Sequence, residues 1–369
     1  MTTTPTATRP ATRPATRTST STAPTSRTAS AAVTVTEIVL PGVVDPAGLQ
    51  VHTRALSAPG RGQVVVAVEA SGVSMAEQSM RRNRYPGQPA FPFVPGYDLV
   101  GIVHSAGPGV DHALVGQRVA ALTKTGGWTT HALVDAADLV AVPAGLDPAE
   151  VETLVVNGIT AWQLLHRASH VQAGQTILVH GANGGVGTIL VQLAHHAGIR
   201  VLGTASPRHH EVLRSLGVLP IDYADPDLAS RVRALAPAGV DAVFDHLGGA
   251  SLTRSWGLLA PGGTLVSYAI LAETGPLIPA FVRVMARLAW WDVLPNGRAA
   301  TFYNVWSGHR TRPGRFRARL RADLTTVLGL LADGTLTAQV AARIPLTDAT
   351  RAMELAESHT ALGKVVLVP

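Results

Sequence analysis

Short apolar runs separated by Gly and Pro dominate the first half of the chain beyond residue 33. Runs that are rich in Val and bounded by turn residues are typical of β-strands. Strands are therefore expected at residues 63–70, 99–103, 117–121 and 139–142. Turn dipeptides such as Pro95-Gly96 lie between them, and this close spacing predicts a small barrel-like β domain.

The pattern changes after Asp147, which can cap a helix that has Pro148 at its first position. Apolar strands then alternate with amphipathic helices. The strands are expected at residues 176–180, 200–204, 240–244 and 264–268, and the helices at 186–196, 209–216 and 252–259. Strand–helix alternation at this spacing predicts an α/β fold with a parallel, doubly wound sheet.

The C-terminal part combines an apolar segment at residues 276–294 with an amphipathic helix at 320–331. Two strand-like segments follow, at 339–344 and 364–368. The α/β part is therefore expected to be inserted into a domain built from both ends of the chain. The predicted parts are a disordered low-complexity tail at 1–32, a β domain at 33–156 and 301–369, and a nucleotide-binding domain at 157–300.

The composition excludes several kinds of site. The 369 residues are 46% hydrophobic, which is enough for a sizeable core, and they include no cysteine. A disulfide scaffold, a Cys-ligated zinc, an iron–sulfur cluster and a thiol nucleophile are therefore excluded. The Thr-, Ala-, Pro- and Arg-rich tail cannot bury enough apolar area to offset its ordering entropy, so it is expected to be dispensable for chemistry.

The net charge of +6 is concentrated at the N-terminus, because the tail carries four arginines and no acid. The remainder shows no basic stripe, so nucleic-acid binding is not expected. No segment reaches the about 18 uncharged apolar residues that a membrane span needs, and the N-terminus lacks the apolar region of a secretory signal. We therefore expect a cytoplasmic protein with no stable membrane insertion.

A glycine-rich loop follows the expected strand at 176–180 and precedes the expected helix. It runs from Gly181 through Gly184, Gly185 and Val186 to Gly187. Gly184 would let backbone amides approach a pyrophosphate at the helix N-terminus, and Gly187 would let the helix pack closely on the strand. The complete strand–loop–helix context predicts a dinucleotide site rather than an ordinary turn.

The residues after the second strand indicate which dinucleotide binds. An NAD site usually carries an acid about 20 residues beyond the glycines. Counting from Gly184 reaches Thr204, and no acid occurs before Glu211. Ser206 and Arg208 could instead donate hydrogen bonds to a 2′-phosphate, which predicts NADPH. The alternative is a solvated loop at the start of a helix.

Several segments together resemble one protein family. They are residues 71–86, 94–103, 157–165, 177–198, 242–268 and 363–369. In this order they are similar to the zinc-independent quinone oxidoreductase, or zeta-crystallin-like, branch of the medium-chain dehydrogenase/reductases. The resemblance implies a Rossmann doubly wound sheet inserted into a GroES-like β-barrel domain, with an active cleft between them. It also implies NADPH-dependent reduction of a quinone or an α,β-unsaturated carbonyl, usually by a homodimer.

The resemblance also bears on metal binding. Zinc-dependent relatives have Cys at the position of Ser74 and His at the position of Tyr97, and they hold a second zinc with four cysteines. This chain has none of these ligands, so metal-free catalysis is expected.

Family members commonly carry one Asn and two Tyr in the cleft. The matching positions here are Ser74, Ser79 and Tyr85, so only Tyr85 is retained. Tyr85 is either a hydrogen-bond donor to the substrate or a packed side chain that caps a loop. By resemblance Asn157 and Thr160 face the nicotinamide, although Asn157 could instead cap a helix at 158–166. Ser74, Tyr85, Asn157 and Thr160 are the catalytic candidates.

Further cofactor contacts are implied by the same resemblance. Tyr223 matches a tyrosine beside the 2′-phosphate, with a sheet-edge aromatic as the alternative. His246 and Leu247 would lie under the nicotinamide ribose, where carboxyl ends of strands form the crevice, although His246 could be purely structural. Tyr268 closes the matching segment 242–268 and joins the cofactor candidates, whereas Asp98 is expected to be a structural carboxylate.

Two segments and two rival functions stay open. Residues 279–294 could line a large substrate pocket, form a dimer interface or touch lipid. The arginine run from Arg310 to Arg321 is either a solvated face or a site for an anionic carrier such as a phosphopantetheine arm. The chain could also be an enoyl-thioester reductase of fatty-acid, polyketide or other secondary metabolism, or a non-catalytic NADPH-binding scaffold or sensor.

Overall fold

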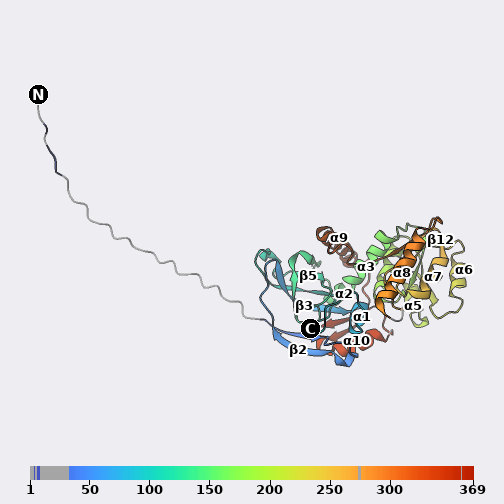
Figure 1. The fold of residues 1–369 in the computed structure, drawn as a ribbon, viewed down its shortest axis with the longest axis horizontal. Coiled ribbons are helices and arrows are strands. Elements are labelled where there is room, and N and C mark those ends of the chain that lie inside the picture. Colours follow the sequence, from blue (N-terminus) through green and yellow to red (C-terminus); the bar gives the residue numbers. More distant parts are fainter. Residues whose placement is uncertain (1–3, 5, 9–32, 273–275, 359) are drawn as a thin grey trace. The chain divides into compact units, whose positions relative to one another are not determined.

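Two large β-sheets and the helices around them form the body of the protein (Figure 1). The structure is a computed structural model, and it describes residues 4, 6–8, 33–272, 276–358 and 360–369. The predicted disordered tail at 1–32 lies almost wholly outside the described residues. The described residues from 33 onward belong to one compact unit.

The first sheet has six parallel strands in the order β10-β9-β8-β11-β12-β13. These strands are β8 (Thr176–His180), β9 (Arg200–Ala205), β10 (Val218–Asp222), β11 (Val240–Asp245), β12 (Leu259–Ser267) and β13 (Ala299–Phe302). The strand order reverses between β8 and β11. That arrangement is the doubly wound fold, in which a dinucleotide lies across the reversal point at the carboxyl ends of the strands.

Helices cover both faces of this sheet (Figure 1). They are α4 (Gly185–His196), α5 (His210–Ser215), α6 (Leu228–Leu235), α7 (Gly249–Leu258) and α8 (Leu277–Asp292). Alternate strand residues face opposite layers: Ile177 packs in one core with α4, whereas Leu178 packs in another with α7 and α8. Strands buried on both faces explain the nearly continuous apolar runs in this part of the sequence.

The second sheet has seven strands and is mainly antiparallel. Its strands are β3 (Gln63–Val73), β4 (Asp98–Ala106), β5 (Arg118–Leu122), β6 (His131–Asp135), β7 (Val140–Ala141), β14 (Val340–Pro345) and β15 (Lys364–Val368). Inward-facing valines and leucines, such as Val66 and Leu99, fill its interior. The strands β14 and β15 come from the C-terminal part of the chain, so both chain ends contribute to this sheet.

The remaining elements pack around the second sheet. They are the hairpin β1 (Thr34–Val39) and β2 (Gln50–Ala55), the helices α1 (Met75–Arg81), α2 (Pro148–Leu154) and α10 (Ala349–Glu357), and short 3-10 turns at Pro46–Gly48, His112–Leu114, Ala136–Asp138 and Leu346–Asp348. A further 3-10 turn, Pro207–His209, instead joins β9 to α5 beside the first sheet. Asp147 caps α2 with Pro148 at the first helical position, as the sequence predicts.

Two helices join the two sheets. They are α3 (Val156–Gln163), which continues into a π-helical turn at Leu164–Ala168, and α9 (Pro313–Ala332). Val100 of the second sheet, Val179 of the first sheet and Val327 of α9 belong to one continuous core. The predicted α/β class with a parallel doubly wound sheet is confirmed, whereas the domain boundaries at 156/157 and 300/301 stay predictions. Along the described part of the chain, no helix is both long and apolar enough to cross a membrane.

Candidate functional site

The glycine loop leaves the carboxyl end of β8 and begins α4. Gly181 has a φ of +64°, and Gly184 caps α4 without a side chain that could bond to the first-turn amides. A Cβ added at Gly187 would lie only 2.3 Å from the carbonyl oxygen of Gly181. The loop is therefore a backbone cradle, in which the amides at the start of α4 stay available to a phosphate.

Two candidate side chains close around this cradle. A Cβ at Gly185 would lie 2.4 Å from Asn157 Nδ2, and one at Gly181 would lie 2.6 Å from His246 Cε1. Asn157 is not the cap of α3, because Val155 holds that position and has no side-chain cap bond. The alternative of a helix-capping Asn157 is therefore not what the structure shows. Its side chain instead lies against the loop.

A buried hydrogen-bond chain holds the loop in place. Thr204 Oγ1 accepts the backbone N–H of Gly181 at 3.2 Å and lies 3.2 Å from His180 Nδ1. His180 Nε2 lies 3.1 Å from Ser255 Oγ, which donates to Asp245 Oδ2 at 2.8 Å. Burial lowers the pKa of His180, so its neutral form can link these two hydroxyls. Thr204 is itself buried, so it positions the loop rather than offering an exposed contact.

Ser206, Arg208 and Tyr223 gather at the carboxyl ends of β9 and β10. Arg208 Nε donates to Ser206 Oγ at 3.2 Å, and Tyr223 N donates to Ala205 O at 3.3 Å. Tyr223 is 64% exposed, so its ring can take a ligand against its face. Asp222, the carboxylate at the end of β10, accepts the backbone N–H of Ala224 at 3.0 Å.

His246, Leu247 and Tyr268 come together at the ends of β11 and β12. Asp245 Oδ1 accepts Leu247 N at 2.8 Å, and Tyr268 N donates to Asp245 O at 3.0 Å. The rings of His246 and Tyr268 lie 5.7 Å apart. Burial raises the pKa of Tyr268, which keeps its phenol neutral. These residues border the loop through the contact of His246 with Gly181.

Thr160 lies three residues after Asn157, so the two share one face of α3. The Tyr303 hydroxyl donates to Gln163 Oε1 at 3.1 Å, and the nearby Thr160 side chain lowers the pKa of the same phenol. Burial raises the pKa of Tyr303. Thr160 is therefore grouped with a partly buried tyrosine that the sequence does not point to.

Tyr85 belongs to a separate aromatic group, the tyrosine cluster of Tyr85, Tyr97 and Trp306. The two tyrosine hydroxyls lie 2.5 Å apart, and Trp306 Nε1 donates to the Tyr97 hydroxyl. Burial raises the pKa of both phenols, that of Tyr97 strongly, so both are neutral at ordinary pH. The sequence points to Tyr97 only as the residue that stands where zinc-dependent relatives have His. Its role as partner of Tyr85 depends on tertiary contacts.

Ser74 has a local role in the fold. It caps α1 in a capping box: Ser74 N donates to Glu77 Oε2 at 2.9 Å, Ala76 N donates to Ser74 Oγ at 3.1 Å, and Ser74 Oγ donates to Glu77 Oε2. The other oxygen of Glu77 accepts Tyr97 N at 2.6 Å. Ser74 therefore helps to position the tyrosine cluster through Glu77, and its own hydroxyl is occupied.

Asp98 is a buried carboxylate at the start of β4. Its Oδ2 accepts Val156 N at 2.9 Å and lies 2.8 Å from Lys364 Nζ, which also contacts Glu152 Oε1 at 2.7 Å. These contacts tie three distant segments together. Within the described ranges, no three His, Asp or Glu side chains come close enough together to hold a metal ion.

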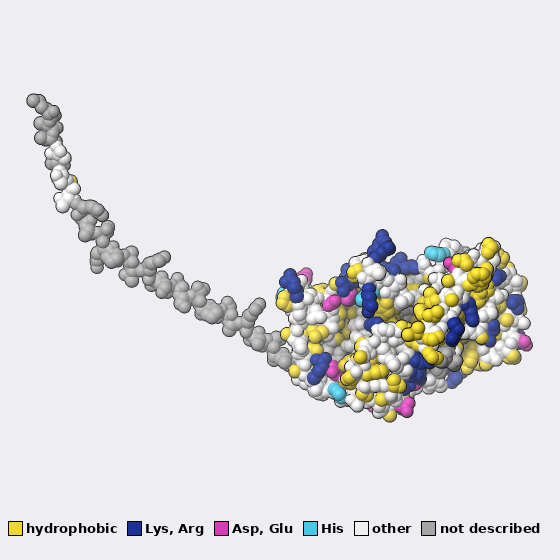
Figure 2. Space-filling view, viewed as in Figure 1, with side chains coloured by type: hydrophobic (Ala, Val, Ile, Leu, Met, Phe, Trp, Pro, Cys, Tyr) yellow, Lys and Arg dark blue, Asp and Glu magenta, His cyan; other side chains and the backbone are white. Residues whose placement is uncertain are grey.

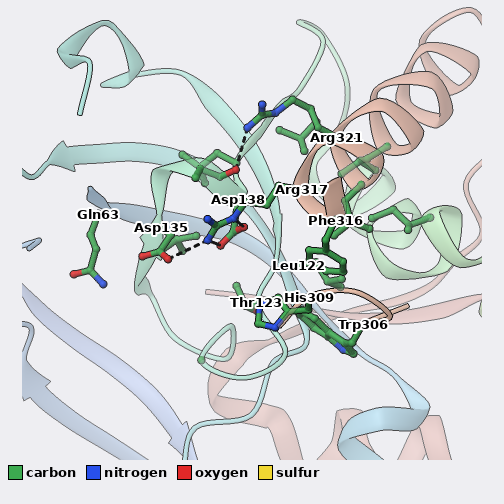
Figure 3. Close-up of a pocket in the computed structure, with 18 of the residues that line it drawn as sticks. Gln63, Leu122, Thr123, Asp135, Asp138, Trp306, His309, Phe316, Arg317 and Arg321 are labelled. Carbon is green, nitrogen blue, oxygen red and sulfur yellow. Dashed lines mark hydrogen bonds and ion pairs between the residues drawn. The ribbon is translucent and has the colours of Figure 1, made fainter. Parts of the chain in front are cut away.

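A pocket of about 240 Å³ lies between α9 and the strands β5 to β7 (Figure 3). Phe316 and Leu320 of α9 line it, and Arg317 crosses it to Asp138 at 2.6 Å. Trp306 and Thr123 line its other end, and both also contact Tyr97. The pocket therefore adjoins the tyrosine cluster, whereas the glycine loop is not part of its wall.

Two family models match the chain. Residues 60–144 match the alcohol dehydrogenase GroES-like domain, and residues 216–367 match the zinc-binding dehydrogenase family. Zinc binding is part of the second family's name, whereas this chain has no cysteine. The matches agree with the second sheet as the GroES-like part and the six-stranded sheet as the Rossmann-like part.

Individual proteins give the same result. The human synaptic vesicle membrane protein VAT-1 homolog is 32% identical over 338 residues, which are 89% of this chain and 84% of that protein. The Escherichia coli quinone oxidoreductase complexed with NADPH has a TM-score of 0.79 and 25% identity, and covers 90% of this chain and 100% of its own. The phthioceranic/hydroxyphthioceranic acid synthase of Mycobacterium tuberculosis is 31% identical over 318 residues, 84% of this chain but 14% of the synthase. The chain belongs to the medium-chain dehydrogenase/reductase superfamily, in its quinone oxidoreductase and VAT-1-like branch.

Proposed function

We propose that the protein is an NADPH-dependent, zinc-independent reductase of a quinone or an α,β-unsaturated carbonyl. The observation that carries this proposal is the backbone cradle at Gly181–Gly187 beside Ser206 and Arg208. A cradle of amides suits a pyrophosphate, and a serine with an arginine suits a 2′-phosphate. The Escherichia coli quinone oxidoreductase, solved with NADPH, supports the same cofactor.

The residues present fit the cofactor. Gly187 leaves room for α4 to approach the loop, and Asn157 and His246 close around it. Tyr223 would flank the adenosine end, and Leu247 and Tyr268 the nicotinamide end. NADPH, when bound, supplies a hydride.

The tyrosine cluster supplies the hydrogen bond that the acceptor needs. Trp306 donates to the Tyr97 oxygen, so the Tyr97 hydroxyl can donate its own hydrogen bond to the Tyr85 oxygen. In that arrangement the Tyr85 hydroxyl is left to donate to the carbonyl oxygen on which negative charge develops. Neutral phenols with raised pKa values serve as donors rather than bases. Thr160 and Asn157 remain our candidates for orienting the acceptor beside the nicotinamide.

A second candidate activity is the reduction of an enoyl thioester. The similarity to the mycobacterial phthioceranic acid synthase favours it, although this chain spans only 14% of that protein. Both activities use the same hydride and the same oxygen-binding hydroxyl, so they differ only in the group attached to the carbonyl.

The test is an oxidation assay with NADPH and NADH against a naphthoquinone, a simple enone and an enoyl-CoA. We expect NADPH to be consumed with at least one acceptor and NADH to be the poorer donor. A preference for NADH contradicts the cofactor assignment. Tight binding of NADPH with no oxidation by any acceptor contradicts the enzymatic proposal and favours a scaffold or sensor.

The homodimer that the family resemblance implies stays a prediction. The edge strand β13 ends the six-stranded sheet, and hydrophobic side chains gather over α8 (Figure 2). The exposed ones include Ile278, Val282 and Trp290. Light scattering on the eluting protein measures the mass directly, and a monomer at working concentration would contradict the dimer.

A further inference from the structure

Two loops meet at Tyr97 and bring two cationic side chains to the tyrosine cluster. The carbonyl oxygen of Tyr97 accepts Thr123 N at 2.9 Å and Lys124 N at 3.0 Å. The hydroxyl of Tyr97 accepts a hydrogen bond from Trp306 Nε1. Trp306 begins a turn in which His309 N donates to Trp306 O at 3.0 Å. Arg310 comes directly after this turn. The buried Tyr97 therefore contacts both loops, the one with Thr123 and Lys124 and the one that begins at Trp306.

Lys124 is held in an unusual conformation. Its φ of +69° lies in the left-handed region, which non-glycine residues rarely adopt. Its Nζ donates to Gly87 O at 2.6 Å and lies 5.8 Å from the centre of the Tyr85 ring. The chain has only one other lysine, the buried Lys364. The ammonium group is thus fixed beside the proposed donor.

Arg310 adds a second positive charge beside the same pocket, since Thr123 and Thr125, which flank Lys124, and His309, which precedes Arg310, all line it. Burial first, and then the charge of Arg310, lower the pKa of Lys124. Among the described residues neither of them forms an ion pair. Further along the arginine run, by contrast, Arg317 binds Asp138 and Arg319 donates to Ser307 O at 2.8 Å.

The arginine run is therefore divided by structure. Arg317, Arg319 and Arg321 are bound to oxygens of the protein, whereas Arg310 is exposed and has no such partner in the described part of the chain. Figure 2 shows dark blue side chains gathered over α9, which begins next to Arg310. Two neighbouring cations that lack a carboxylate partner are stabilised by an anion that binds both.

We propose that Lys124 and Arg310 bind a phosphate group carried by the acceptor, next to the carbonyl-binding hydroxyl of Tyr85. This inference rests on the proposed function and names its substrate class: an unsaturated carbonyl attached to a phosphorylated carrier. A phosphopantetheine thioester and a phospholipid present the same group. The choice of probe distinguishes these two sources of the phosphate.

The test compares two ligands that differ only in the phosphate. Calorimetry measures the binding of hexanoyl-phosphopantetheine and hexanoyl-pantetheine to the full chain, with excess NADP⁺ present to occupy the dinucleotide site. Neither probe can be reduced, so the readout does not depend on turnover. We expect the phosphorylated probe to bind at least about tenfold more tightly at low salt, and this difference to shrink as salt is added.

Matched variants identify the residues. Lys124→Asn removes the charge with a residue that tolerates the left-handed conformation, and Arg310→Gln removes the second charge. Each should abolish most of the preference for phosphate, whereas Lys124→Arg should retain it. The control is Arg233→Gln, which removes an exposed arginine of α6. Equal affinity for the two probes, or a preference that survives both charge-removing variants, overturns the proposal.

Dihexanoyl phosphatidic acid is the second arm. If it binds more tightly than hexanoyl-phosphopantetheine and depends on Lys124 and Arg310, the phosphate comes from a lipid headgroup; the reverse order supports a carrier arm. Reduction of a neutral enone by the unaltered protein tests the proposed function separately. An active enzyme with no phosphate preference would therefore reject the phosphate subsite alone.

Discussion

The hydroxyl oxygens of Tyr85 and Tyr97 lie 2.5 Å apart, with Trp306 donating to Tyr97 from the other side. When Trp306 donates to Tyr97 and Tyr97 donates to Tyr85, only the phenolic proton of Tyr85 is left to be shared with a ligand. In the function that we propose, the pair divides two tasks: Tyr97 holds the cluster together, and Tyr85 meets the substrate.

Tyr85→Phe should lower kcat/KM for an enone about 100-fold, because a donor to the developing negative charge is lost. The dissociation constant of NADPH should not change. Steady-state kinetics and a fluorescence titration of NADPH measure the two quantities. Full activity in Tyr85→Phe would remove Tyr85 as the donor.

Tyr97→Phe should instead act on stability. The partly buried Trp306 N–H loses its acceptor, which costs about 1 kcal/mol in the free energy of unfolding. Urea unfolding measures this loss. Ser79→Ala is a suitable control, since the Ser79 hydroxyl bonds only to the carbonyl oxygen of Met75 in its own helix. Equal stabilities of Tyr97→Phe and the unaltered protein would contradict the role given to Tyr97.

Gly187→Ala should disrupt the cradle, because its Cβ would lie 2.3 Å from the carbonyl oxygen of Gly181. We expect a loss of about 1–3 kcal/mol in stability from overpacking and at least about tenfold weaker NADPH binding. Gly257→Ala is the matched control: it lies in α7 with nothing within 4 Å of the added Cβ. That variant should be slightly stabilised, since alanine favours a helix over glycine. Similar effects from both substitutions would rule out the close contact.

The local parts of this architecture could be predicted from the sequence. The strand expected at 176–180 has the same bounds as β8, and the glycine loop lies where its motif places it. Both signals are contiguous in sequence. The strand β10 is short, contains Pro220 within its apolar residues, ends in Asp222 and is completed by its pairing with β9. Such a strand depends on its neighbour, so sequence pattern alone does not reveal it.

The site shows the same division. Ser74 and Glu77 have the spacing of a capping box, so the structural role of Ser74 could have been recognised from sequence. The contact of Tyr97 with Trp306 spans 209 residues, and that of His180 with Ser255 spans 75. No short motif encodes such contacts. The predicted site residues therefore fall into several groups whose contacts only the folded chain defines.

Arg208→Gln should change the choice of cofactor. Losing charge-assisted hydrogen bonds to the 2′-phosphate should lower kcat/KM for NADPH about 10- to 100-fold and leave that for NADH within about twofold. The control is Arg214→Gln, an exposed arginine in the last turn of α5. An equal loss with both cofactors would show that Arg208 acts on the fold instead.

Lys364→Met should be among the most destabilising single changes. Lys364 Nζ lies 2.8 Å from Asp98 Oδ2 and 2.7 Å from Glu152 Oε1, and all three groups are buried. Burial disfavours the charged lysine, but the two carboxylates outweigh it and raise the pKa of Lys364. Removing the lysine leaves buried carboxylates unpaired, at a cost of about 3–5 kcal/mol.

The exposed pair Arg343–Asp147, 2.8 Å apart, provides the comparison for Lys364. Arg343→Gln should cost less than about 1 kcal/mol, since surface ion pairs contribute little. Urea unfolding of both variants measures the difference. If the two losses were alike, the buried group would not be a determinant of stability.

The pH dependence of stability should include a contribution from His180. Burial places its folded-state pKa below the ordinary value near 6.5, so the unfolded chain binds a proton more readily once the pH falls below about 6.5. The free energy of unfolding must therefore decrease as the pH is lowered from about 6.5 toward the folded-state pKa, by at most about 1.4 kcal/mol per pH unit for this group. His131, His166 and His209 also have lowered pKa values and add to the total.

The contribution of His180 is isolated by His180→Gln, which keeps a polar side chain but cannot titrate. Unfolding in urea at pH 7.5 and 5.5 should show a smaller drop for this variant than for the unaltered protein, whereas the exposed His112→Gln should show the same drop as the unaltered protein. If His180→Gln lost as much stability between the two pH values as the unaltered protein does, the neutral imidazole between Thr204 and Ser255 would not be what holds the loop.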